Sequence, residues 1–406
     1  MREMKESGVE WIGEIPAHWS PIRFRFIAKI TTGNQDTQNA DPDGEYPFYV
    51  RSPIVERCNN YTFDGKGILM AGDGAGAGRV FHLVDGKYAV HQRVYRFYDF
   101  KYMDPVLLKY YLENLFATVM DYGSAKTTVP SVRLPMIQDF VVCVPPKKEQ
   151  DNIVAVLNEK CAQVGSLISN VQAQIEKLKA YKQSLITEVV TKGLNPTAPV
   201  KNSGVEWIGE IPAHWEVKRG KVLFEESDAR SADGSEELLT VSQYTGITPR
   251  SQKNVNMFEA LTLEGYKICD VGDIAANTMW LWAGAIGVSA YSGVISPSYN
   301  VYRQKAENFV PGYLDCLLRA PMLVQEYASR STGIRASRLR LYPKDFLDIM
   351  FPVPPFGEQQ EIMRVLSDKF AAVDKLIAIK ESKIEKLEQY KKSLIYEYVT
   401  GKREVM

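Results

Sequence analysis

The sequence has few of the residues that metal sites and disulfide frameworks require. Its 406 residues include five cysteines and four histidines. The cysteines are scattered and form no CxxC pair, so neither a disulfide framework nor a zinc site is expected. No run of about 18 apolar residues occurs, and the first residues lack the apolar core of a secretion signal. We therefore expect a cytoplasmic protein without a transmembrane helix.

An excess of charge of one sign is missing as well. Lysine and arginine total 49, aspartate and glutamate also total 49, and the formal net charge is zero. Bulk charge therefore does not indicate a nucleic-acid or membrane partner, and DNA binding would need a local basic surface. Apolar residues make up 45% of the chain. This composition and length are typical of two or three domains with sizeable cores.

What the sequence does contain is a long internal repeat. The stretch SGVEWIGEIPAHW at 7–19 recurs letter for letter at 203–215. A second pair of markers follows, VPPKKEQ from Val144 and VPPFGEQ from Val353, and each opens a long segment of helical pattern. The sequence therefore predicts one framework in two copies, each with a Trp-rich lead, a globular segment and a long helix.

The globular segments have diverged more than this framework. Both alternate β-like runs with turns and short helices, so we predict a mixed α/β fold, although its strand order does not follow from the sequence. The expected regions are the lead 1–20, a globular region 21–143, a long helix 144–193, a linker with the second lead 194–216, a globular region 217–352 and a long helix 353–402.

Apolar residues in the two long segments recur at heptad spacing, with polar skips at Lys182, Lys380 and Lys391. About 44 residues at 1.5 Å each would form a rod of roughly 66 Å. A rod with one apolar stripe needs a partner, which the other copy can supply; ordinary bundle helices are the alternative. The expected seam between the helices consists of Ile168, Ile175, Leu178, Leu185, Ile377, Ile384, Leu387 and Leu394.

No constellation of residues in the sequence indicates catalysis. The Gly-rich stretch 73–79 lacks the Lys-Ser or Lys-Thr of a phosphate loop, so a flexible turn is favoured over a nucleotide cradle; a loop that contacts DNA is a further interpretation. The VPPF stretch at 353–356 is similar to a motif of amino-methyltransferases in which the first side chain accepts a hydrogen bond from the target amine. Val353 has no such acceptor, so this activity is not indicated. His18 and His214 lie in the repeated lead, where a structural role is favoured. We predict no catalytic and no metal-ligating residues.

Two stretches free of acidic residues, 122–138 and 330–344, are rich in Ser, Thr and Gly and carry two and five basic residues, respectively. Such loops can anchor phosphates and read guanine edges with arginine; a solvated basic edge is the alternative. For Trp280 and Trp282, packing in the core is favoured over contact with bases. The candidate DNA-binding residues, including one in the Gly-rich stretch, are Arg79, Lys126, Thr127, Thr128, Arg133, Arg330, Arg335, Ser337, Arg338, Arg340 and Lys344.

In its repeated SGVEWIGEIPAHW lead and the VPPxxEQ start of each helix, the chain resembles the specificity subunits of type I restriction–modification systems over essentially its whole length. The resemblance implies a non-catalytic DNA-binding subunit with two target-recognition domains, each reading one half of a bipartite target. It implies paired spacer helices and no cofactor in this chain. The implied partners are double-stranded DNA, two modification subunits that use S-adenosylmethionine, and motor–nuclease subunits that use ATP and Mg.

The symmetry of DNA supports this interpretation independently. Strands of the duplex are related by two-fold axes perpendicular to the helix axis, so a duplicated protein reading one site should have a matching pseudo-two-fold. Helices related by that axis and lying along the DNA run antiparallel. Because the globular segments differ, the target should be asymmetric. The alternatives are a subunit of a methylation-only or fused-nuclease system, a stand-alone DNA-modifying enzyme, and a coiled-coil scaffold without DNA function.

Overall fold

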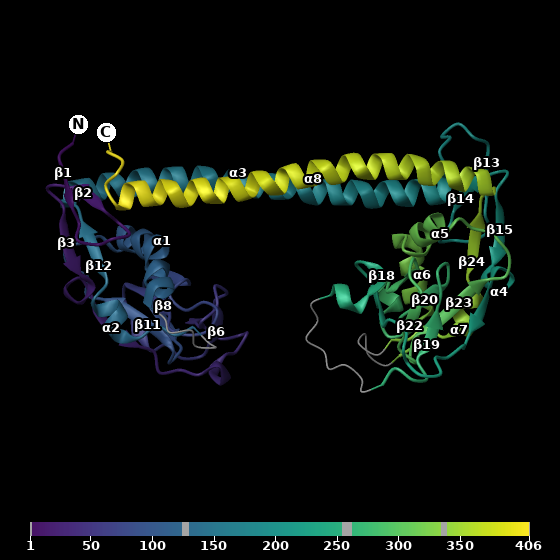
Figure 1. Ribbon diagram of the computed structural model, residues 1–406, viewed down its shortest axis with the longest axis horizontal. Helices are drawn as coiled ribbons and strands as arrows, with labels where there is room; N and C mark the ends of the chain where they lie inside the picture. Colours follow the sequence, from purple (N-terminus) through teal and green to yellow (C-terminus); the bar gives the residue numbers. More distant parts are fainter. Residues whose placement is uncertain (1, 124–129, 254–261, 334–338, 406) are drawn as a thin grey trace. The chain divides into compact units, whose positions relative to one another are not determined.

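The computed structural model describes residues 2–123, 130–253, 262–333 and 339–405, without the side chains of 119–123. The chain divides into two compact units, residues 1–172 with 381–406, and residues 173–380. Two long helices, α3 (Lys147–Lys192) and α8 (Phe356–Val399), each contribute residues to both units (Figure 1). Each unit therefore combines a globular part with a stretch of both helices.

The first unit contains two four-stranded sheets. The antiparallel sheet has the order β4 (Lys29–Thr32), β11 (Val94–Tyr98), β8 (Gly67–Ala71), β9 (Phe81–Val84). The other sheet, in which β5 and β10 are parallel, has the order β6 (Glu56–Cys58), β5 (Tyr46–Tyr49), β10 (Lys87–Val90), β7 (Phe63–Asp64).

Short strand pairs and helices complete the first unit. The pairs are β1 (Met4–Glu6) with β2 (Glu14–Pro16), and β3 (Ser20–Arg23) with β12 (Val141–Val144). The helices are α1 (Pro105–Gly123), α2 (Leu134–Gln138) and the 3₁₀ turns η1 (Phe24–Phe26) and η2 (Thr37–Asn39).

The second unit is built in the same way around one four-stranded antiparallel sheet. Its order is β16 (Phe224–Ser227), β23 (Asn300–Gln304), β20 (Ile274–Ala276), β21 (Ile286–Val288). The strand pairs are β13 (Val200–Asn202) with β14 (Glu210–Pro212), β15 (Glu216–Arg219) with β24 (Met350–Val353), β17 (Leu239–Ser242) with β18 (Gly246–Pro249), and β19 (Lys267–Cys269) with β22 (Gly293–Ile295).

Several helices of both globular parts begin at proline. The missing N–H of proline has no partner to lose in the first turn of a helix. In the second unit α5 (Pro311–Leu318), α6 (Pro321–Arg330) and α7 (Pro343–Leu347) all start at proline, as α1 does in the first. Three shorter elements are α4 (Gly220–Leu223) and the 3₁₀ turns η3 (Arg250–Gln252) and η4 (Leu281–Ala283).

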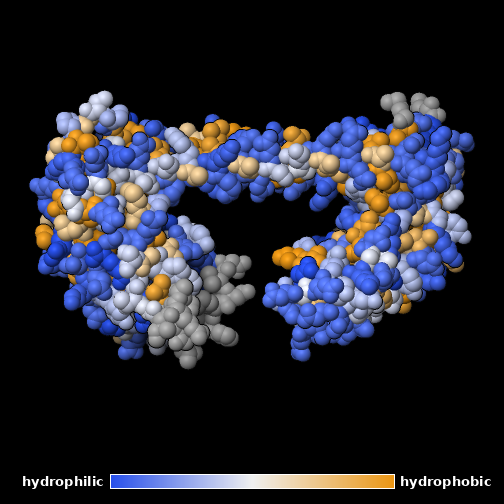
Figure 2. All heavy atoms as spheres, turned by 180° about the vertical axis from the view of Figure 1, so that it is seen from behind, coloured by the Kyte–Doolittle hydropathy of each residue, from blue (hydrophilic) through white to orange (hydrophobic). Residues whose placement is uncertain are grey.

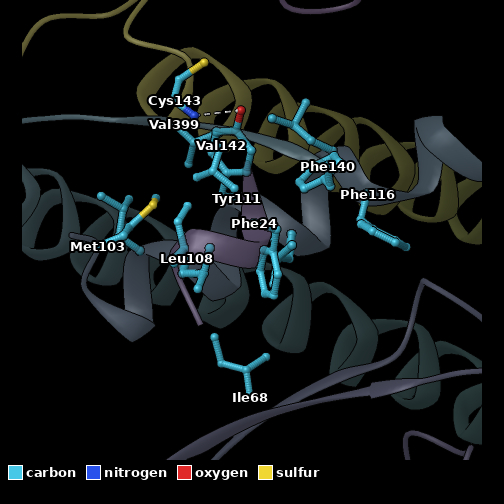
Figure 3. Packing of buried hydrophobic residues seen from close by; sticks show 14 of the residues in the cluster. Phe24, Ile68, Met103, Leu108, Tyr111, Phe116, Phe140, Val142, Cys143 and Val399 are labelled. Carbon is cyan, nitrogen blue, oxygen red and sulfur yellow. Dashed lines mark hydrogen bonds between the residues drawn. The ribbon is translucent and has the colours of Figure 1, made fainter. Parts of the chain in front are cut away.

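The core of the first unit contains side chains from its antiparallel sheet, from α1 and from both long helices. Tyr111 of α1 is fully buried, and its hydroxyl donates to the Val141 carbonyl at 3.2 Å and accepts from the Cys143 N–H at 3.2 Å. Figure 3 shows the second of these bonds among the packed side chains. Leu157 of α3 and Leu394 of α8 belong to the same hydrophobic cluster. The helices are thus part of this core.

The second unit has a corresponding core. Tyr313 of α5 is fully buried and its hydroxyl donates to the Val190 carbonyl of α3 at 3.0 Å. Two polar contacts join α3 to α8: Lys182 Nζ lies 2.7 Å from Asp374 Oδ1, and Lys380 Nζ donates to Gln174 Oε1 at 2.5 Å. Because residue number falls along one helix as it rises along the other, the two stretches in this unit run antiparallel.

The residues expected to form the helix seam are all at least half-buried. Ile175, Leu185 and Leu394 are buried. The half-buried members are Ile168, Leu178, Ile377, Ile384 and Leu387. A seam along the whole length of both helices stays a prediction.

Within the described ranges no helix is both long and apolar enough to cross a membrane, and the visible face of both globular parts is mainly hydrophilic (Figure 2).

Candidate nucleic-acid interface

The repeated lead binds the first turn of a long helix in each unit. Trp19 Nε1 donates to Glu149 Oε2 at 3.0 Å, and His18 Nε2 lies 2.9 Å from the same oxygen. In the second unit Trp215 Nε1 donates to Glu358 Oε2 at 3.0 Å. Both tryptophans are fully buried. Each carboxylate also lies near the positive end of its helix dipole, which favours it further.

Burial alone would raise the pKa of the Glu149 carboxyl. Hydrogen bonds from His18, Trp19 and Arg2, together with the charge of Arg2, outweigh burial and lower this pKa below its ordinary value. Glu149 is therefore ionised at neutral pH and accepts all three donors. His214 lies 2.8 Å from Glu358 in the second unit, so both lead histidines have the structural role predicted for them.

The glutamine that follows each glutamate joins the helix start to the globular part. Gln359 is fully buried; its Nε2 donates to the carbonyls of Pro354 and Asn308 at 2.9 Å each, and its Oε1 accepts from the Val310 N–H at 2.9 Å. Gln150 bonds in the same way to Pro145, Tyr102 and Asp104 in the first unit. Each glutamine therefore fixes the loop that leads into α1 or α5.

A glycine ends each long helix against the lead that holds the other helix. Gly193, directly after α3, has φ +70°, and a Cβ there would lie 3.2 Å from the ring of Trp215. Gly401, after α8, has φ +71°, and a Cβ there would lie 3.1 Å from the ring of Trp19. Each buried tryptophan thus meets the start of one long helix and the end of the other.

The Gly-rich stretch 73–79 forms the turn between β8 and β9 in the first unit. Its own carbonyls accept from its own backbone: the Ala77 N–H bonds to the Gly74 carbonyl and the Arg79 N–H to the Gly76 carbonyl, both at 3.0 Å. This geometry is that of a turn and not of a phosphate cradle. The turn lies beside the segment after α1, since the Gly74 N–H donates to the Pro130 carbonyl at 3.0 Å.

Asp73, at the start of this turn, holds two arginines from other loops. Arg51 Nη1 donates to Asp73 Oδ1 at 2.9 Å, and Arg93 Nη1 donates to Asp73 Oδ2 at 2.6 Å. Burial raises the pKa of the Asp73 carboxyl, but the hydrogen bonds and charges of both arginines outweigh it and lower the pKa overall. A hollow of about 620 Å³, lined in part by Arg51 and Asp73, lies beside the turn.

The corresponding turn of the second unit, between β20 and β21, carries aromatic side chains. Trp280 and Trp282 stack with ring centroids 5.7 Å apart and planes inclined by 27°. Trp282 Nε1 donates to the Met279 carbonyl at 2.9 Å, which fixes it on its own turn. Trp280 is 50% exposed. The expectation that it packs in the core is therefore wrong, because the short turn η4 directs it to the surface.

Comparison with known proteins agrees with the fold and the motifs. Residues 16–177 match the family described as type I restriction modification DNA specificity domain. The chain is 22% identical to the specificity subunit of the type I restriction enzyme EcoDI from Escherichia coli, covering 89% of this chain and 83% of that one. It is 24% identical to the MjaVIII specificity subunit from Methanocaldococcus jannaschii, covering 96% and 93%. Over most of its length the chain is thus similar to specificity subunits of type I restriction enzymes.

A solved chain from a study of complex assembly and conformational transition of the type I system has the same fold. Its TM-score is 0.65 at 16% identity, with 96% of this chain and 99% of that chain covered. Within the described residues of the chain, no group of three histidine, cysteine or acidic side chains is placed to hold a metal ion.

The structure describes about half of the candidate DNA-binding residues. Arg79 and Arg133 are exposed on the adjoining turn and segment of the first unit. In the second, Arg330 Nε bonds to Glu326 Oε1 at 2.5 Å, while Arg340 and Lys344 are exposed. The candidates that lie outside the described residues are Lys126, Thr127, Thr128, Arg335, Ser337 and Arg338.

Arg51 and Arg93 were missed by the sequence interpretation. Neither stands in a run of basic residues, so charge patterning does not single them out. The sequence feature that could have indicated them is their position beside apolar strand-like runs, shortly after β5 and directly before β11. That signal is weak, because most arginines at strand ends are simply solvated. Asp73 brings the two together through contacts that are distant in sequence.

Proposed function

We propose that this chain is the non-catalytic, sequence-reading subunit of a type I complex, and that each globular region reads one half of a bipartite DNA target. One observation carries the proposal: two α/β regions rest on the same Trp–Glu–Gln junction but differ in the side chains at and around the equivalent turn. The first presents Arg51 and Arg93 around Asp73, and the second presents Trp280. Because the frameworks are similar and the side chains around these turns differ, the two halves of the target should differ as well.

The long helices would serve as spacer and docking surface. The contacts of Lys182 with Asp374 and of Lys380 with Gln174 support an antiparallel pair in the second unit. We extend this pairing to the full length of α3 and α8, as a coiled coil related by the pseudo-two-fold of the repeat. The helices would then set the separation of the half-sites.

The partners proposed for this chain are double-stranded DNA, two modification subunits and motor–nuclease subunits. The relatives support this assignment because they are named as subunits of type I restriction enzymes. S-adenosylmethionine, ATP and Mg would be bound by those partners. The chain itself would contribute recognition and assembly.

Exchange of one globular region tests this proposal. We expect that replacing 217–352 with the corresponding segment of another specificity subunit changes one half of the target and leaves the other half intact. The measurement is sequencing of methylated adenines in cells that express the chimera with its modification partner. A change in both halves, or in neither, would contradict the modular assignment.

Trp280 should contribute to binding in the second half-site. Truncating an aromatic residue at an interface typically weakens binding by about 1 kcal/mol or more. We therefore expect Trp280→Ala to weaken the affinity of the assembled complex for its target at least about 5-fold. Competition binding with labelled duplex measures this, with Phe26→Ala, an exposed aromatic of the first unit outside the long helices, as the control. Equal affinities of the two variants would contradict a DNA contact by Trp280.

A further inference from the structure

The Arg51–Asp73–Arg93 cluster has the properties of a base-reading site. We propose that Arg51 and Arg93, positioned by Asp73, read a guanine in the major groove of the first half-site. The inference rests on the proposed function and names the base pair that this part of the surface recognises. The sequence did not indicate it, since the cluster forms from three separate loops.

The cluster is arranged to present donors outward. The side chains of Arg51 and Arg93 are 41% and 62% exposed, whereas that of Asp73 is 15% exposed. A guanidinium has five N–H donors, so a bond from one Nη to Asp73 leaves others for a second partner. The Asp73 carboxylate therefore anchors two guanidinium groups, whose remaining N–H donors are accessible.

The backbone around the cluster is fixed on all three loops. The Gly72 N–H donates to the Arg93 carbonyl at 2.9 Å, and the Arg93 N–H donates to His91 Nδ1 at 3.0 Å. Asp73 forms an isolated β-bridge with Ser131. A Cβ at Gly76 would lie 2.6 Å from the Arg51 carbonyl oxygen, so this close approach requires glycine. A site held in this way loses little conformational entropy on binding.

The carboxylate favours a base over a phosphate as the ligand. Asp73 lies between the two guanidinium groups and offsets part of their charge, and it would repel a phosphodiester. The major-groove edge of guanine carries two neutral acceptors, N7 and O6, which suit an arginine fork. An arginine fork that Asp73 holds in place therefore suits the guanine of a G·C pair.

Substitution of each arginine tests the inference in the assembled methylation complex. Once the target is mapped, methylation rates are measured on duplexes in which each base pair of the first half-site is replaced. We expect Arg93→Gln or Arg51→Gln to remove about 5- to 150-fold of discrimination at one G·C position. Arg93→Lys keeps the charge but not the planar fork, so it should lose part of the same discrimination.

Asp73→Asn tests positioning, because it leaves both arginines present and weakens their anchor. We expect partial loss of discrimination at the same base pair. Arg25→Gln is the matched control, since Arg25 is 40% exposed and pairs with Asp139 elsewhere in the first unit. It should leave the preferred sequence unchanged.

Two results would overturn the inference. One is an unchanged preference at every position in both glutamine variants; the other is uniform weakening without any change of preferred base, which is the signature of a phosphate contact. Failure of the proposed function is a separate result, because the 217–352 exchange would then also leave the target unaltered. If the 217–352 exchange changes the second half of the target while the arginine variants leave the first half unchanged, this inference alone is rejected.

Discussion

Trp215→Ala is expected to destabilise the second unit by about 3–5 kcal/mol, the usual range for truncating a buried aromatic to alanine. Trp215 is fully buried and meets the start of α8 through Glu358 and the end of α3 at Gly193. Its removal leaves a cavity and takes away the indole donor of Glu358. Both long helices lose their contact with the lead at this point.

Hydrogen–deuterium exchange measures the effect within each unit separately. Peptides of 173–380 should exchange faster in Trp215→Ala, whereas Trp19→Ala should act on the first unit. Trp280→Ala is the matched control, because Trp280 is half exposed and its loss leaves no buried cavity. It should change DNA affinity with little effect on exchange. Equal protection in Trp215→Ala and wild type would contradict the structural role of the lead.

Gln359→Leu is expected to have an effect of similar size by a different mechanism. Leucine has nearly the same volume but cannot bond to the Pro354 and Asn308 carbonyls or to the Val310 N–H. A buried polar group that loses its partner costs about 1–3 kcal/mol. Three such groups are affected, so the second unit should unfold at clearly lower urea concentration than wild type.

The adjacent Gln360 offers a close control, because it is exposed on the same helical turn. Gln360→Leu should change stability by no more than about 0.5 kcal/mol, as surface substitutions usually do. Urea unfolding followed by tryptophan fluorescence compares the two variants. Similar midpoints for Gln359→Leu and Gln360→Leu would show that the bonds of Gln359 are not needed.

The long helices could be predicted closely because their signals are local. Pro145-Pro146 and Pro354-Pro355 precede α3 and α8, and glycine follows each helix at 193 and 401 with positive φ. The same holds for β12 and β24, which lie within apolar runs that precede the proline pairs. Local steric preferences and caps determine such boundaries with little help from tertiary contacts.

The sheet order could not be predicted, because the paired strands are far apart in sequence. β11 pairs with β4 and β8, and β23 pairs with β16 and β20. The exposed position of Trp280 was mispredicted for a related reason. An aromatic residue in an apolar stretch suggests a core position, whereas the turn η4 determines its actual exposure.

By itself, the sequence determined the duplicated framework, the two long helices and the resemblance to specificity subunits, since identity of letters and helical spacing need no coordinates. Only the tertiary structure decided what the markers do: Trp19 and Trp215 bind glutamates more than a hundred residues away. It alone also placed Arg51 and Arg93 on Asp73. The physical reason is that hydrogen bonds and ion pairs act over a few ångströms in space, whatever the separation along the chain.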